Sequence, residues 1–247
     1  AIWVIRFLRG RTTLLKIKKE YMKIDSKILW SCIGLGLSPF IMQATESIIA
    51  IAFNISLQKY GGDLAVGAMT ILTSIMQFSM LPLMGLTQGA QPIVSYNYGA
   101  RNSSRVKETF TLLLKASVIY STALWAIVML FPQMFARIFT SDQSLVQTTI
   151  SALRIYMAAS LVFGIQISCQ QTFIALGKAK ISVFLALLRK VILLIPFIFI
   201  LPLFMEDKVN AVFLAEPIAD IIAVTVTAIM FTAQFKNTLE KLHNSEK

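Results

Sequence analysis

Long apolar blocks separated by short polar turns dominate the chain from about residue 28 onward. About 20 consecutive apolar residues cross a bilayer as a helix, so each block is predicted to be a membrane-spanning helix. The six blocks cover about 28–57, 64–96, 110–131, 146–176, 181–203 and 209–231. Strands of a membrane β-barrel would alternate in polarity at half this length. The pattern therefore predicts an all-α membrane protein with six transmembrane helices.

Composition and charge agree with this interpretation. Hydrophobic residues make up 56% of the 247 residues and charged residues 14%, whereas soluble domains carry about 25% charged residues. The formal net charge is +11, but the basic residues lie between the apolar blocks. They therefore indicate membrane topology and contact with anionic lipid rather than nucleic acid. The chain has one histidine and no Walker, HExxH or CxxC motif, so no enzyme activity, cofactor or metal is expected.

The distribution of lysine and arginine predicts an orientation. If each block crosses once, 19 basic residues lie on one side and 3 on the other, with Arg154 inside a span. Basic loops stay in the cytoplasm, so both ends of this segment are predicted to be cytoplasmic. Four regions are expected: the end of a preceding transmembrane helix, a basic linker, a six-helix lobe and a cytoplasmic tail. Their bounds are 1–8, 9–27, 28–231 and 232–247.

Carboxyl groups inside the predicted spans are the first candidates for function. Glu46 lies near the middle of the first span, and Gln43 and Asn54 share its helix face. A protonated acid is far cheaper than a carboxylate in a membrane, which suits a site for H⁺ or another cation. The alternative is a hydrogen bond that only packs two helices.

The sixth block carries a second acidic pair. Glu216 and Asp220 are one helical turn apart, so they share a face. Pro217 between them removes a backbone donor and can bend or break the helix. Both acids are candidates for coupling ion flow to transport. The alternative for Glu216 is a position near the outer water layer, without such a role.

Neutral polar residues and helix-breaking residues complete the candidates. The amides are candidates for the lining of a substrate cavity, and the glycines and prolines are candidates for hinges, with plain helix packing as the alternative for both sets. The amides are Gln77, Gln88, Gln91, Gln166 and Gln170, together with Gln43 and Asn54, and the hinge set is Pro39, Gly85, Gly89, Pro92 and Pro217.

The passage GLTQGAQPIVSYNYGARNSSRVKE (85–108) resembles the second-helix-and-loop motif in the C-terminal half of MATE (multidrug and toxic compound extrusion) transporters. The stretches 170–202 and 215–220 resemble later helices of the same family, in its bacterial multidrug-exporter branch. The resemblance covers about 31–236. It implies one six-helix lobe of a twelve-helix transporter, with an N-terminal lobe absent from this segment.

The resemblance also implies a function. MATE transporters exchange drugs for H⁺ or Na⁺, and Glu46 matches the family's coupling acid on its seventh helix by placement. The tenth helix, at 146–176, offers only glutamines where some Na⁺-coupled members have an acid, which favours H⁺. The expected substrates are amphipathic organic cations, and the expected location is the bacterial plasma membrane. Two alternatives stay open: a lipid-linked oligosaccharide flippase, disfavoured because Arg154 is the one basic residue assigned to a span interior, and a non-transporting fragment.

Overall fold

A computed structural model of the chain describes residues 2–8 and 26–246. These fall into two compact units, Ala1–Ile41 and Met42–Lys247. The first unit contains α1 (Ile2–Leu8) and the start of α2 (Ser26–Gly99). Most of the predicted linker, residues 9–25, lies outside the described residues, as do the side chains of Pro39 and Gln43.

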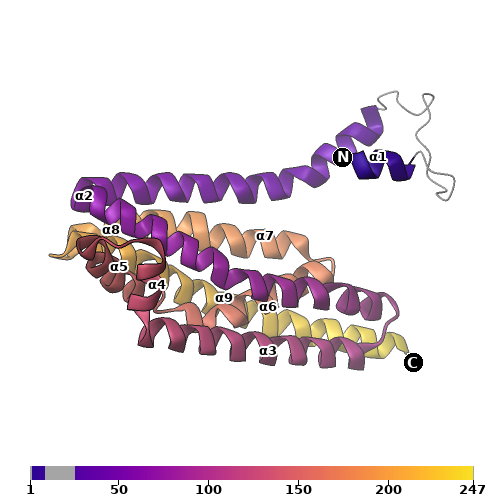
Figure 1. Cartoon of the computed structure of the whole chain (residues 1–247). Helices are drawn as coiled ribbons and strands as arrows, with labels where there is room; N and C mark the ends of the chain where they lie inside the picture. Colours follow the sequence, from indigo (N-terminus) through magenta and orange to yellow (C-terminus); the bar gives the residue numbers. More distant parts are fainter. Residues whose placement is uncertain (1, 9–25, 247) are drawn as a thin grey trace. The chain divides into compact units, whose positions relative to one another are not determined.

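The second unit is built from helices alone over the residues that are described (Figure 1). After α2 come α3 (Ser103–Leu130), α4 (Pro132–Phe139), α5 (Gln143–Tyr156), the short 3-10 helix η2 (Ser160–Val162), α6 (Phe163–Ala175), α7 (Ala179–Leu187), the π-helix η3 (Leu188–Leu194), α8 (Ile195–Phe204) and α9 (Lys208–Glu246). The predicted all-α class is therefore confirmed.

Gly62 divides α2 into two helical segments. Its φ of 62° and ψ of −156° are not helical, and only glycine adopts such a conformation without strain. The core contains Phe53 and Leu57 from the segment before Gly62 and Ala68 and Leu72 from the segment after it. The chain thus reverses at Gly62 and packs the two segments into one core (Figure 1).

Membrane-spanning helices are identified by length and hydropathy. Four continuous helices among the described residues are long and apolar enough to cross, or five if α5 and α6, bent by 46° at η2, form one broken span. One of the four, Ala44–Gly99, contains the reversal at Gly62. The protein is therefore a multi-pass membrane protein, and the count of six spans stays a prediction.

Two apolar clusters hold the second unit together. One joins both segments of α2 to α5, α8 and α9 around Phe53, Leu153 and Phe213. The other joins α3, α6 and α9 around Phe173 and Phe231. In this second region α3 and α6 approach so closely that a methyl group on Gly164 would overlap the backbone of Ser117.

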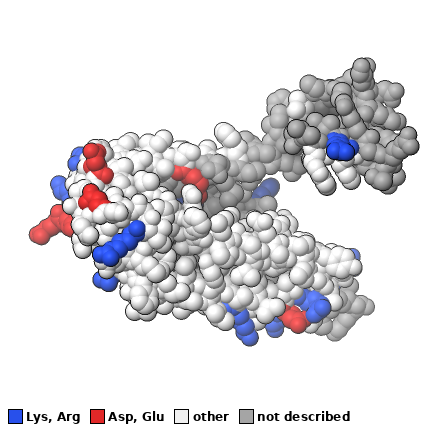
Figure 2. Space-filling view, viewed as in Figure 1, with Lys and Arg blue, Asp and Glu red and all other residues white. Residues whose placement is uncertain are grey.

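Charged side chains gather near the two ends of the second unit, with few on the band between them (Figure 2). Large apolar side chains are exposed on this unit, including Ile51, Phe78 and Ile119. Such a surface is stable only against lipid or another apolar partner.

Candidate functional site

A buried ion cluster joins η3 to α9 near the middle of two spans. The guanidinium Nη2 of Arg189 lies 3.1 Å from Oε1 of Glu216, and its Nε donates to Oδ1 of Asp220. The side chains are 16%, 7% and 1% exposed, respectively. Arginine presents its donors in a planar fork, so one side chain can hold two carboxylates at once. The cluster neutralises most of the charge that burial would otherwise make costly.

Local helix geometry explains how the three groups meet. Glu216 and Asp220 share a face of α9 because residues four apart lie one turn above each other. Arg189 lies in a π-helical turn in which the Ile195 N–H donates to the Lys190 carbonyl, five residues earlier. Pro196 follows, and its ring and missing N–H disfavour an ordinary α-helical turn before it. The widened turn is where η3 contacts α9.

Pro217 does not break its helix, although the sequence suggested that it could bend or break it. α9 runs without interruption from Lys208 to Glu246 and contains Pro217 in its interior. The residue is buried. The proline therefore leaves the two acids on one continuous helix, and no unwound segment separates them.

A second ion pair lies beside the cluster. The Lys190 ammonium contacts Oε1 of Glu46 on α2, with side chains 24% and 49% exposed. Lys190 also interacts electrostatically with Glu216 and Asp220. The adjacent residues Arg189 and Lys190 thus connect α2 and α9 through opposite charges.

The charges of this centre do not cancel. Two cations, Arg189 and Lys190, face three carboxyl groups, those of Glu46, Glu216 and Asp220. With all five groups ionised, one negative charge is left over. In a low-dielectric environment a proton or a monovalent cation would relieve this excess. Glu46 is the most exposed of the five side chains.

Aromatic and polar neighbours complete the centre. The Arg189 guanidinium carbon lies 5.4 Å from the centre of the Phe163 ring, a favourable cation–π arrangement. Tyr156 is buried and packs edge-on against Phe53, with ring centres 6.1 Å apart. Oδ2 of Asp220 is buried without a hydrogen-bond partner among the described residues. This oxygen is a free acceptor inside the cluster.

The predicted cavity amides fall into two groups. Asn54, Gln77 and Gln88 are exposed and Gln91 is half-buried, all on α2. Gln166 is 2% exposed, and Gln170 donates to the Ser182 carbonyl with Nε2 at 3.2 Å. The α2 amides thus lie at the surface of this unit, whereas Gln166 lies in its interior.

The glycine-rich part of α2 has open space around it. A methyl group on Gly85 or Gly89 would meet no atom within 4 Å, and Pro92 is exposed. Close packing within the described part of the chain therefore does not explain these residues. α2 is helical through all three positions.

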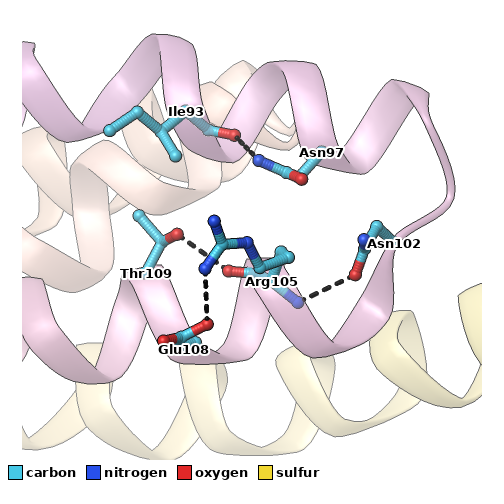
Figure 3. Close-up of polar contacts among 6 residues, drawn as sticks. All are labelled: Ile93, Asn97, Asn102, Arg105, Glu108 and Thr109. Atoms are coloured by element: carbon cyan, nitrogen blue, oxygen red, sulfur yellow. Dashed lines mark hydrogen bonds and ion pairs between the residues drawn. The ribbon is translucent and has the colours of Figure 1, made fainter.

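The turn after this helix is held by local polar contacts (Figure 3). The Asn102 side chain caps α3 by accepting from the Arg105 N–H at 3.0 Å, and Arg105 pairs with Glu108 at 3.0 Å. Asn97 donates to the Ile93 carbonyl at 2.8 Å. The polar residues that end the sequence motif thus shape the α2–α3 turn.

Sequence reasoning missed Arg189 and Lys190. Both were assigned to a cytoplasmic turn, but they lie inside the candidate span Lys180–Phe204, with Arg189 about 14 Å from its start at 1.5 Å per residue. The assignment of Arg154 as the one basic residue within a span is therefore wrong. The sequence does contain a signal for this placement. Apolar residues flank Arg189 and Lys190 over more than one helical turn on either side, which places the pair inside an apolar block.

A multi-pass helical unit with paired charged groups inside its spans has the character of a membrane transport protein. The MatE family profile matches residues 39–200 of the chain. The chain is 25% identical over 202 residues to the multidrug export protein MepA of Staphylococcus aureus (strain NCTC 8325 / PS 47), covering 81% of this chain and 44% of that protein. MepA of Staphylococcus saprophyticus is 24% identical over 199 residues, covering 81% and 43%.

Solved structures show the same fold. The MATE multidrug transporter DinF-BH, in complex with R6G, matches with a TM-score of 0.78 and 33% identity, over 96% of this chain and 52% of that one. An inward-facing MATE transporter of the MOP superfamily matches with a TM-score of 0.86 and 21% identity, over 97% and 55%. The chain belongs to the MATE family of membrane transporters, and it spans about half the length of the curated relatives it matches.

Proposed function

We propose that this chain is the C-terminal lobe of a drug:cation antiporter that exports amphipathic organic cations. The observation that carries the proposal is the uncompensated negative charge of the centre formed by Arg189, Lys190 and their three carboxyl partners. Glu46 is the most exposed member of this centre. A proton and a cationic drug would each neutralise this charge, so binding of one disfavours binding of the other. Such mutual exclusion is the thermodynamic basis of exchange.

The exposed surface of α2 supports the substrate class. Asn54, Gln77 and Gln88 are isolated amides among exposed apolar side chains such as Ile51 and Phe78. An apolar wall with a few polar groups suits molecules with a flat hydrophobic body and one charge. We propose that this surface lines a cavity shared with a second lobe.

Two conformations of the family support movement of the lobe as one body. The inward-facing structure and an outward-facing one, 20% identical over 97% of this chain, match with TM-scores of 0.86 and 0.81. The fold of this unit is thus similar in both. Alternating access would then be a rocking of two lobes around a fixed site. In this arrangement both ends of the segment are cytoplasmic and the membrane is the bacterial plasma membrane.

The charge arrangement favours H⁺ over Na⁺ as the coupling ion. Sodium needs several free oxygen ligands, but Arg189 already occupies one oxygen of Glu216 and one of Asp220. Among the described residues no group of three acidic, histidine or cysteine side chains could hold a metal ion. Protonation of one carboxyl group needs no further ligand.

The charge balance also separates this proposal from a lipid-linked oligosaccharide flippase. The sequence argument against a flippase was that Arg154 is the one basic residue inside a span. Arg189 and Lys190 also lie inside a span, so that argument no longer holds. Both, however, are paired with carboxylates, and the centre as a whole is negative. A pyrophosphate group would be repelled there.

The test is ion-driven efflux of a cationic dye from proteoliposomes that contain the complete two-lobe transporter. Glu46→Gln removes the exchangeable charge without changing side-chain size, and we expect coupled efflux to fall to background with normal folding. Glu206→Gln, at an exposed carboxylate between α8 and α9, is the matched control and should retain efflux. Separate pH and Na⁺ gradients identify the ion.

Unchanged efflux in Glu46→Gln would refute Glu46 as the coupling group. The 247-residue chain should be assayed alone and with the complementary lobe. Coupled efflux that needs both lobes supports the proposal, whereas no efflux in either sample supports the non-transporting alternative.

A further inference from the structure

A groove of about 510 Å³ runs between α3, α6 and α9, away from the ion cluster in sequence and in lining residues. Its lining is apolar except for Thr232 and two lysines, and none of it comes from α2 or η3. Phe110 packs against Phe231 and Phe235, with ring centres 4.5 and 4.9 Å apart. The aromatic cluster provides a rigid apolar wall.

The two lysines lie at the same end of the groove. Lys107 is in the first turns of α3, one turn before Phe110, and Lys236 follows Phe235 on α9. Both are exposed, and neither forms an ion pair within the described residues. The nearby Glu108 is paired with Arg105, and Glu240 is exposed one turn beyond Lys236. The end of the groove therefore presents two available positive charges.

The length of the groove matches one membrane leaflet. On α3 its lining runs from Lys107 to Val118, and on α9 from Ala228 to Leu239. Each stretch rises about 16 Å at 1.5 Å per residue. Half of a hydrocarbon core is about 15 Å thick. A chain that starts at the lysines would thus end near the bilayer centre, beside Val118, Ile165 and Ala228.

We propose that this groove binds an anionic phospholipid, with one acyl chain against the phenylalanine cluster and the phosphate between Lys107 and Lys236. An apolar slot one leaflet long, with positive charge at one end only, is complementary to such a lipid in shape and in charge. The lysines lie on the side predicted to be cytoplasmic, where anionic lipids attract basic groups. No carboxylate of the described residues belongs to the lining of the groove.

A lipid bound in the groove would hold three helices together. α3, α6 and α9 each supply part of the lining, so a lipid in the groove contacts all three. A ligand that binds the folded protein and not the unfolded one raises its stability by mass action. Bound anionic lipid should therefore stabilise the folded lobe more than a neutral lipid with the same acyl chains.

The experiment measures lipid binding to the full chain purified in nonionic detergent, by native mass spectrometry and by the lipid-dependent shift in melting temperature. The probes are phosphatidylglycerol and phosphatidylcholine with identical acyl chains. Lys107→Gln with Lys236→Gln should weaken phosphatidylglycerol binding by about fivefold per lysine, roughly 25-fold in all. Arg101→Gln with Lys180→Gln removes two exposed basic groups of the same predicted side that do not line the groove, and it should change binding little.

A second variant tests the acyl-chain part of the site. Ala228→Trp fills the inner end of the groove and should reduce the binding of both lipids without altering the preference for the anionic one. Raised ionic strength should weaken phosphatidylglycerol binding only. Equal binding of the two lipids by the unmodified chain, or unchanged phosphatidylglycerol affinity in the double lysine variant, would overturn the proposal.

Discussion

Substitution of Arg189 by leucine is the sharpest test of the buried ion cluster. Leucine keeps an apolar side chain at the position but removes both donors to Glu216 and Asp220, whose side chains are 7% and 1% exposed. The remaining carboxyl groups would be unpaired in the interior. Removal of one partner from a buried ion pair typically costs about 3–5 kcal/mol of stability.

The structure places the expected loss at the upper part of that range, because one arginine serves two carboxyl groups. In a chain of 247 residues, each 1 kcal/mol shifts the melting temperature by about 2–4 °C. Arg189→Leu should therefore lower it by roughly 8–20 °C. The measurement is thermal unfolding of purified protein in detergent, followed by size-exclusion chromatography of the soluble fraction.

Two matched variants isolate the cause. Arg154→Leu is the same change at an exposed arginine in the last turn of α5, and it should alter stability by less than about 0.5 kcal/mol. Glu216→Gln with Asp220→Asn in the Arg189→Leu background removes the stranded charges and should recover most of the loss. If Arg189→Leu were as stable as Arg154→Leu, the cluster would not be an energetically coupled unit and the reasoning would be refuted.

Four further changes test the packing and the turns. Gly164→Ala forces α3 and α6 apart at the Ser117 backbone and should cost about 1–3 kcal/mol, whereas Gly85→Ala, with open space around it, should be neutral or stabilising by up to about 1 kcal/mol in the same unfolding assay. Asn102→Ala removes the cap of α3 and should cost about 1 kcal/mol; equal stability would show that the cap is replaced by water. Gly62→Ala places a methyl group at φ 62° and ψ −156°, a conformation that is essentially restricted to glycine. It should lower stability by about 1–3 kcal/mol by strain, measured against Gly99→Ala as the control.

The sequence by itself determined that the protein is an all-helical membrane protein. Within the bilayer no water is present to pair with backbone polar groups. A hydrophobic block that crosses it must therefore form its hydrogen bonds within its own segment, as a helix does. The spacing of Glu216 and Asp220 was equally local, since residues four apart share a face. The polar end of the motif at 85–108 predicted a turn, and Asn102 and Arg105 shape that turn.

Only the tertiary structure decided which charges meet. Arg189 is 27 and 31 residues from its two partners, and its pairing depends on the rotation of one packed helix against another. Arg189 lies in a π-helical turn that contacts α9, and a hydropathy pattern does not predict such a turn. Lys190 and Glu46 met for the same reason, while Gln166, similar in sequence to the exposed amides of α2, became buried. Local propensity fixes where helices form, but the depth and the partner of a polar side chain are set by helix packing.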